Sequence, residues 1–174
     1  MIWLKLLGSA LVLLSSGYLG LQMASAYRRR PRELAALRSG LQLLETEIVY
    51  GATPLPAALR QVAAGLDGTA GELFQKAGQT LSRGRGITGG EGWSRALGEV
   101  YPYSALTPED LGALRLLGVS LGASDRADQV KHLALCRERL AHLEEQAKDR
   151  DRRYSRVWSY AGFLTGLLVV LVLI

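Results

Sequence analysis

The stretch from Glu33 to Ile48, ELAALRSGLQLLETEI, places hydrophobic side chains at the spacing of an α-helix. Its large aliphatic residues recur every three or four positions and therefore share one helix face: Leu34, Leu37, Leu41, Leu44 and Ile48. Gly51 and Pro54 follow this stripe, and both residue types resist continuation of a helix. No strand-like alternation of hydrophobic and polar residues occurs in the sequence. We therefore predict an all-α fold.

Helical spacing continues through the middle of the chain. Hydrophobic residues between Leu55 and Leu66 predict a second, short helix, and the spacing of Phe74, Ala77 and Leu81 predicts a third. Further stripes follow, at Trp93, Leu97 and Val100, then at Leu111, Leu114, Leu117 and Leu121, and finally at Val130, Leu133, Cys136, Leu140, Leu143 and Ala147. Together they predict a bundle of about six helices.

Short polar motifs mark where the later helices begin. Thr88 and Glu91 have the three-residue spacing of a capping box. Thr107-Pro108-Glu109-Asp110 combines a capping hydroxyl, a proline in the first turn and acids near the positive end of the helix dipole. Asp125 or Ser124 caps the last helix, which meets no glycine or proline before Gly162. We predict that this helix runs unbroken to the chain end, with a break near Lys148–Arg153 as the alternative.

Both ends of the chain are hydrophobic. Leu6–Tyr27 and Val157–Ile174 contain no charged residue, and about 20 such residues span the hydrocarbon core of a bilayer. We predict three regions: a transmembrane helix at residues 1–27, a cytoplasmic helical-bundle domain at 28–156 and a second transmembrane helix at 157–174. Small residues at four-residue spacing, Gly20 in the first span and Gly162 with Gly166 in the second, indicate close helix packing, unless glycine is simply common there.

The positive charge of the chain lies beside these hydrophobic ends. The formal net charge is +5, yet residues 33–146 hold 11 Lys+Arg against 14 Asp+Glu. The residues that set the predicted membrane topology are Arg28, Arg29, Arg30, Arg32, Arg152, Arg153 and Arg156. Under the positive-inside rule they hold the middle domain in the cytoplasm. A nucleic-acid-binding domain would carry its charge on a folded face, so we expect no nucleic-acid partner.

A cleaved signal peptide is the competing interpretation of the first hydrophobic segment. Ala24-Ser25-Ala26 has the small-residue pattern of a cleavage site. A signal peptide carries positive charge ahead of its hydrophobic region, whereas here only Lys5 precedes it and four arginines follow. We therefore expect an uncleaved anchor.

The sequence offers few groups for catalysis or for binding a cofactor. Gly84–Gly92 is rich in glycine, but the lysine of a phosphate-binding loop does not follow, which indicates a flexible helix connection. Asp128, His132 and Cys136 lie one turn apart on a helix, yet Cys136 falls on a hydrophobic stripe, where a free cysteine is most often a small core residue. We expect no enzymatic activity, no cofactor and no metal site.

Three short stretches of sequence, occurring in this order between two hydrophobic ends, are together specific enough to indicate a protein family. They are Arg30–Leu34, Leu44–Leu55, and Leu121–Arg126 followed by Gln129, Lys131 and His132. On these residues the chain resembles the stage III sporulation protein AB family of endospore-forming bacteria, and the resemblance covers essentially its whole length. The glycine-rich Gly84–Gly92 looks more flexible than the corresponding region of that family.

The resemblance implies a part in the channel, or feeding tube, that joins mother cell and forespore after engulfment. The family is similar to the inner-membrane platform protein of type II secretion systems, which has a related helical-bundle domain. A member would be a multi-pass protein of the cell membrane, in the mother-cell membrane around the forespore. Its partners would be a secretion-type ATPase, sporulation protein AA, together with other channel subunits and further copies in a homo-oligomer.

The candidate partner-binding residues cluster at the start of the last helix. They are Asp125, Arg126, Gln129 and Lys131, with Glu47 as a weaker candidate, although capping and solvation explain the cluster equally well. We expect Tyr50 in the core. The leading function is a structural platform subunit that links a cytoplasmic ATPase to the membrane. The alternative is a membrane-anchored helical regulator or receptor, which predicts a roomy pocket with converging polar groups.

Overall fold

Helices, turns and loops make up all of the chain that the computed structural model describes, which is residues 28–51, 53–84, 86–122 and 125–173, with side chains through residue 153. The all-α prediction is confirmed. The chain divides into two compact units. One is Arg30–Glu145, which holds the bundle, and the other combines Met1–Arg29 with Gln146–Ile174.

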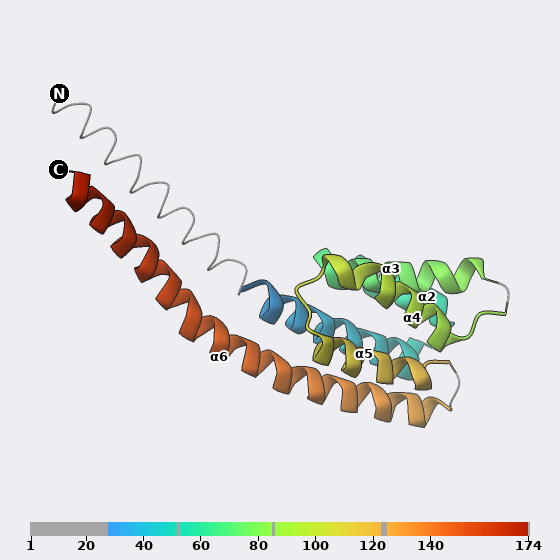
Figure 1. Cartoon of the computed structure of the whole chain (residues 1–174). Helices are drawn as coiled ribbons and strands as arrows, with labels where there is room; N and C mark the ends of the chain where they lie inside the picture. Colours follow the sequence, from blue (N-terminus) through green and yellow to red (C-terminus); the bar gives the residue numbers. More distant parts are fainter. Residues whose placement is uncertain (1–27, 52, 85, 123–124, 174) are drawn as a thin grey trace. The chain divides into compact units, whose positions relative to one another are not determined.

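The helices follow one another with short connections (Figure 1). A helix over residues 28–46 ends in a π-helical turn, η1 (Glu47–Gly51). After it come α2 (Leu55–Ala64), α3 (Gly68–Arg83), α4 (Gly89–Val100), a 3-10 turn η2 (Tyr101–Tyr103), α5 (Pro108–Ser120) and α6 (Arg126–Leu173). The predicted break at Gly51 and Pro54 falls at the end of η1 and just before α2, and Gly122, in the turn after α5, has a φ of 73°, which favours glycine.

The capping motifs begin helices as predicted. At α4, the hydroxyl of Thr88 accepts a hydrogen bond from the Glu91 N–H at 3.2 Å, and the Glu91 carboxylate accepts one from the Thr88 N–H at 3.0 Å. At α6, Asp125 Oδ1 accepts from the Asp128 N–H at 2.8 Å, so Asp125 is the cap. α6 then continues without interruption through the charged stretch near Arg150, which confirms an unbroken last helix.

The core forms where the predicted stripes meet. Leu34, Leu37, Leu41 and Leu44 are at most 1% exposed, and Trp93 is wholly buried. The indole N–H of Trp93 donates to the Leu114 carbonyl oxygen at 2.7 Å, and its ring meets Phe74 edge to face at 5.5 Å. One tryptophan thus joins α3, α4 and α5.

The second half of the glycine-rich stretch has a packing role. Gly90 lies in the first turn of α4, where an added Cβ would come within 2.4 Å of the Gly118 carbonyl oxygen in α5. Because no side chain fits at that distance, glycine allows the two backbones to touch. The expectation of a flexible connection was therefore wrong for Thr88–Gly92, which form the cap and first turn of α4.

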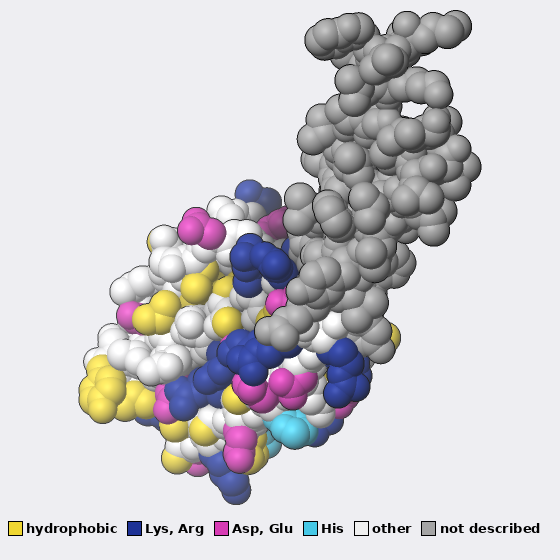
Figure 2. Space-filling model, turned by 90° about the vertical axis from the view of Figure 1, so that its left-hand side faces the viewer, with side chains coloured by type: hydrophobic (Ala, Val, Ile, Leu, Met, Phe, Trp, Pro, Cys, Tyr) yellow, Lys and Arg dark blue, Asp and Glu magenta, His cyan; other side chains and the backbone are white. Residues whose placement is uncertain are grey.

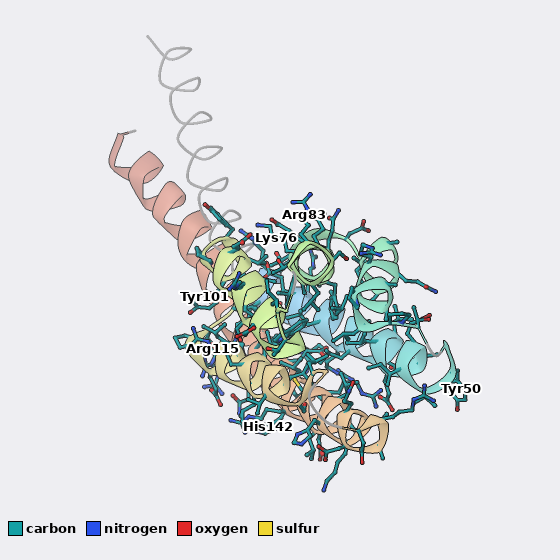
Figure 3. All side chains as sticks on the ribbon, turned by 90° about the vertical axis from the view of Figure 1, so that its right-hand side faces the viewer. Tyr50, Lys76, Arg83, Tyr101, Arg115 and His142 are labelled. Atoms are coloured by element: carbon teal, nitrogen blue, oxygen red, sulfur yellow. The ribbon has the colours of Figure 1, made fainter. Side chains whose placement is uncertain are left out.

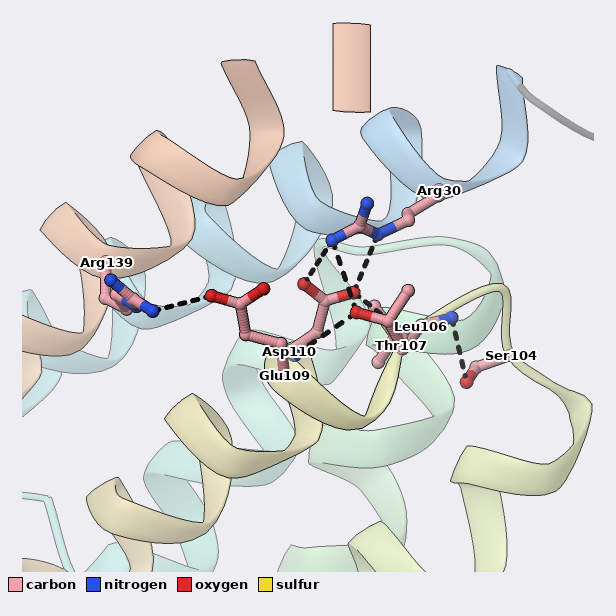
Figure 4. A network of polar contacts seen from close by, with 7 residues as sticks. All are labelled: Arg30, Ser104, Leu106, Thr107, Glu109, Asp110 and Arg139. Atoms are coloured by element: carbon pink, nitrogen blue, oxygen red, sulfur yellow. Dashed lines mark hydrogen bonds and ion pairs between the residues drawn. The ribbon is translucent and has the colours of Figure 1, made fainter. Parts of the chain in front are cut away.

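A buried ion pair ties the first helix to the start of α5 (Figure 4). Arg30 donates from Nε and Nη2 to the two carboxylate oxygens of Asp110, each at 2.8 Å, and from Nη2 to Thr107 Oγ1 at 3.2 Å. Asp110 is 0% exposed and also accepts from the Thr107 N–H at 2.7 Å, which completes the α5 capping box. Burial favours a higher pKa for Asp110, but the bonds from Arg30 and Thr107 outweigh it and hold the pKa below its usual value.

Among the described residues, no helix combines the length and the hydropathy of a membrane span. The predicted first span, residues 1–27, lies outside the described residues. The predicted second span, residues 157–174, belongs to a stretch in which only the backbone is described, through Leu173, and that backbone is α-helical.

Replacing Asp110 with asparagine removes the charge that Arg30 requires inside the bundle. We expect Asp110→Asn to lower the free energy of unfolding by about 3 kcal/mol, because an unpaired buried cation remains. Urea unfolding of the full chain in detergent, followed by circular dichroism at 222 nm, measures the change. The neighbouring Glu109→Gln breaks an exposed ion pair with Arg139 and is the control, with an expected loss below about 1 kcal/mol. Equal losses in the two variants would contradict the assignment.

Acid should abolish the difference in stability between the wild type and Asp110→Asn. Because the folded pKa of Asp110 lies below the unfolded value of about 3.9, its stabilising effect is complete above that value and is lost as the pH falls through the folded pKa. We expect the stability gap between the wild type and Asp110→Asn to be constant from about pH 8 to 5 and to shrink below about pH 4. A gap that persists until the chain acid-unfolds would show that the carboxylate charge is not its source.

Candidate partner-binding surface

The start of α6 and the end of the first helix meet at one end of the bundle. Arg126 Nη1 donates to the Val49 carbonyl oxygen in η1 at 3.5 Å. Farther along the same two helices, Arg137 pairs with Glu45 at 2.7 Å and Glu144 pairs with Arg38 at 2.5 Å. The helices therefore run antiparallel, which brings the predicted residues of α6 next to η1.

The predicted residues of α6 form an exposed polar cluster. Asp125, Arg126 and Lys131 are exposed, whereas Gln129 is half-buried, and its backbone N–H donates to the Asp125 carbonyl oxygen at 3.0 Å. Asp125 caps the helix and Arg126 binds a carbonyl of η1, so both have structural tasks. Lys131 stands one turn into α6 with an exposed side chain.

Glu47 holds the segment between η1 and α2. Its carboxylate accepts from Gln61 Nε2 at 2.9 Å and from Thr53 Oγ1 at 3.2 Å. Together with the Arg126 bond to Val49, these contacts fix the π-helical turn from both sides. Glu47 and Arg126 are thus positioned to shape this surface through the backbone of η1.

Tyr50 is the side chain that this turn presents. It is 83% exposed and points away from the bundle (Figure 3), so the expectation of a core position was wrong. Tyr50 follows the buried Ile48 by two residues, which places it on the opposite side of the turn. Tyr50 follows Val49, whose carbonyl oxygen binds Arg126, and tyrosine and arginine are both enriched in protein-binding hot spots.

The arginines of the predicted membrane boundary differ in their surroundings. Arg28, Arg29 and Arg32 are exposed, whereas Arg30 forms the buried ion pair with Asp110. At the other boundary, Arg152 and Arg153 are exposed, and the side chain of Arg156 lies outside the described part. Gly20 is likewise outside it, and Gly162 and Gly166 fall in the stretch of α6 without described side chains, so their packing stays a prediction.

The surface carries charges of both signs. Figure 2 shows one face of the molecule, on which acidic and basic side chains are interspersed and hydrophobic ones form small groups between them. Such a mixed face gives little of the single-sign field that attracts a polyanion.

A polar groove of about 490 Å³ lies between the first helix and α6. It is the feature that a ligand-sensing protein would need, because polar groups could converge on a bound molecule there. Its two guanidinium groups already bind carboxylates of the chain, Arg38 with Glu144 and Arg137 with Glu45. The rest of the groove is lined mainly by small residues, together with two longer polar ones: Ala35, Ser39, Ala134, Ala141, Gln42 and Glu138.

The turn-spaced residues of α6 do not assemble a metal site. His132 Nε2 lies 3.7 Å from Asp128, while Cys136 is 7% exposed and its S–H donates to the Ala113 carbonyl oxygen at 3.6 Å. Among the described residues, no three His, Cys, Asp or Glu side chains gather where a metal ion could bind. Burial raises the pKa of Cys136 to about 12, so the thiol stays protonated at neutral pH.

Comparison with known proteins places this geometry in a family. The family profile described as stage III sporulation protein AB matches residues 5–174. The chain belongs to the stage III sporulation protein AB family. It is similar to stage III sporulation protein AB of Bacillus subtilis (strain 168), with 34% identity over 170 residues, which cover 98% of this chain and 99% of that protein. A solved structure of a stage III sporulation protein AB matches with a TM-score of 0.67 and 33% identity, covering 71% of this chain and 97% of the other.

Membership of the stage III sporulation protein AB family confirms the resemblance drawn from short motifs. Those motifs now have positions: Leu44–Leu55 contains η1, and Leu121–Arg126 joins α5 to α6. Sequence reasoning missed the outward position of Tyr50 and the buried partner of Arg30. For Tyr50 a signal existed, since it stands off the stripe that ends at Ile48. For Arg30 none did, because its partner is 80 residues away.

The buried thiol gives a direct test of α6 packing. We expect Cys136 in the folded full chain to react with a maleimide at pH 7.5 about a thousandfold more slowly than in the chain unfolded by guanidinium. A chain with Cys136→Ala and Gly98→Cys is the control, because Gly98 is exposed and a Cβ there meets no atom within 4 Å. Rapid labelling of Cys136 under folding conditions would contradict its burial against α5.

Proposed function

We propose that this chain is a structural platform subunit of a sporulation channel between mother cell and forespore, and that it links a cytoplasmic ATPase to the membrane. The observation that carries the proposal is the family match, which extends from residue 5 to residue 174. The family name gives the sporulation role. The channel, the ATPase and the membrane location come from the resemblance and from the charge pattern.

The charge pattern supports the membrane part of the proposal. Hydrophobic segments at residues 1–27 and 157–174 are bordered on their inner sides by arginines, and residues 33–146 hold more acidic than basic residues. This distribution retains the middle of the chain on the cytoplasmic side of a multi-pass protein. In a sporulating cell that membrane is the mother-cell membrane around the forespore.

The continuous helix α6 supports the proposed mechanical link between the ATPase and the membrane. α6 begins with the exposed cluster of Asp125, Arg126 and Lys131 and continues without a break to Leu173, inside the second hydrophobic segment. A partner bound at the first turn of α6 therefore acts on the same helix that ends in the proposed membrane span. Tyr50, held by η1 next to that turn, is the side chain best placed to anchor such a partner.

The ligand-sensing alternative finds less support in the bundle. It needs free polar groups in a cavity, and the arginines of the polar groove are occupied by Glu45 and Glu144. The platform function needs only an exposed contact surface.

Binding to the ATPase tests the platform function. Full-length chain in lipid nanodiscs should bind purified sporulation protein AA, and Tyr50→Ala should weaken binding by on the order of tenfold or more, because an exposed aromatic anchor is lost. Biolayer interferometry gives the affinities. Tyr103→Ala is the matched control, because Tyr103 is 78% exposed at η2. The platform function fails if the wild-type chain does not bind. Binding that is unchanged by Tyr50→Ala would move the contact elsewhere.

Topology is tested by labelling a single cysteine. In non-sporulating cells that express the Cys136→Ala, Gly98→Cys chain in their plasma membrane, a membrane-impermeant maleimide should leave position 98 unlabelled until the membrane is permeabilised. Gly98 suits this test better than the tightly packed Gly90, where a new side chain would collide with Gly118. Labelling in intact cells would place the bundle outside and refute the proposed orientation.

A further inference from the structure

An open polar groove lies on α6 just ahead of the second hydrophobic segment. It has a volume of about 320 Å³, and its described lining consists of Gln146, Asp149, Arg150 and Arg153. The last three residues follow Gln146 by three, four and seven positions, so all four share one face of the helix. Asp149, Arg150 and Arg153 are exposed. The platform function proposed above makes no use of this groove.

The two arginines of the groove differ from those of the bundle in their partners. Arg30, Arg38 and Arg137 each pair with a carboxylate of the chain. Within the described part of the chain, by contrast, no ion pair or side-chain hydrogen bond engages Arg150 or Arg153. Guanidinium groups bind phosphate oxygens through paired, charge-assisted hydrogen bonds. Two of them on one helix face, beside open space, therefore suit a phosphate group.

The position of the groove along α6 favours a phosphate at the membrane surface. Because α6 is continuous to Leu173, its rise places the Cα of Arg153 about 6 Å, and that of Arg150 about 10 Å, ahead of Val157, where the hydrophobic segment begins. The headgroup layer of one leaflet is about 5–7 Å thick, and a flexible arginine side chain extends toward it. With residues 157–174 in the bilayer, both guanidinium groups reach lipid phosphates.

Asp149 narrows the class of lipid. One acid against two bases leaves the charged lining with a single positive charge, which matches a phosphodiester better than a doubly charged phosphomonoester. A carboxylate also accepts hydrogen bonds from hydroxyl groups. Phosphatidylglycerol combines one negative charge on its phosphodiester with hydroxyl groups on its headgroup.

We propose that the groove of Gln146, Asp149, Arg150 and Arg153 binds the headgroup of an anionic phospholipid of the phosphatidylglycerol type. Arg150 and Arg153 bind its phosphate, and Asp149 accepts a hydrogen bond from a headgroup hydroxyl. This inference rests on the membrane location given under the proposed function. It goes beyond the positive-inside rule, which depends on the number of basic residues beside a span and not on the helix face that carries them.

Lipid selectivity of the full chain tests the site. We reconstitute the chain in phosphatidylcholine bilayers and measure the association of spin-labelled phosphatidylglycerol and spin-labelled phosphatidylcholine by electron paramagnetic resonance. Phosphatidylglycerol should be selected by on the order of tenfold at low salt. Arg150→Gln and Arg153→Gln should each lower the selection by roughly threefold, and the double variant should abolish it.

Matched variants separate a site from a general attraction of positive charge. Arg152→Gln removes the same charge at nearly the same height, but Arg152 is exposed on another face of α6, so it should leave the selection almost unchanged. The double variant Arg95→Gln, Arg115→Gln removes two exposed charges from α4 and α5 and should also have no effect. Circular dichroism should be the same for all variants.

Three results would overturn the proposed lipid site. The first is a loss for Arg152→Gln equal to that for Arg150→Gln, which would indicate diffuse charge. The second is stronger selection of phosphatidic acid, which lacks a headgroup hydroxyl. The third is displacement of the labelled lipid by millimolar inorganic phosphate, which would identify a site for a dissolved anion.

A sodium carbonate wash of the same vesicles distinguishes this inference from the proposed function. If carbonate extracts the chain, the membrane location is refuted and the lipid site with it. If the chain stays in the bilayer but does not select phosphatidylglycerol, the lipid site alone is refuted.

Discussion

Asp110 is a charged side chain with no exposed surface, and the arrangement of the bundle follows from how that charge is satisfied. Its two carboxylate oxygens each accept a hydrogen bond from Arg30, and Oδ2 also accepts the bond from the Thr107 N–H that forms part of the α5 capping box. Three residues farther along the first helix, Glu33 accepts a bond from the Ala105 N–H just ahead of α5 at 2.8 Å. The loop before α5 is thereby fixed to the helix at residues 28–46. Opening this joint would leave a desolvated carboxylate in the interior, which is far more costly than losing an exposed pair.

The parts of the fold that could be predicted depend on residues close together in sequence. Spacing alone indicates that one helix face carries Leu34, Leu37, Leu41 and Leu44. The motif of Thr88 and Glu91 indicates a helix start in the same way. The unbroken α6 was predictable because no glycine or proline interrupts it before Gly162. The family could be recognised for the same reason, since its motifs are short runs of adjacent residues.

The features that escaped prediction depend on contacts between distant segments. Arg30 seemed to be one of four equivalent arginines, and only the fold brings Asp110 to it. The candidate surface was predicted at the start of α6, and the structure adds contacts that the sequence did not indicate: Glu47 and Arg126 hold η1, and Tyr50 is exposed there. An aromatic residue has high affinity for both cores and interfaces, so its type did not distinguish the two.

The setting of Trp93 has an optical consequence. Its indole lies 3.0 Å from where a side chain on Gly118 would begin, touches Phe74 and donates to Leu114. Any loosening between α4 and α5 would admit water to this ring and shift its fluorescence emission to longer wavelength. The other tryptophans, Trp3 and Trp158, belong to the hydrophobic ends of the chain. A protein with phenylalanine at those two positions would therefore carry a single native fluorophore at the centre of the bundle. That fluorophore would reveal whether binding events at the surface deform the interior.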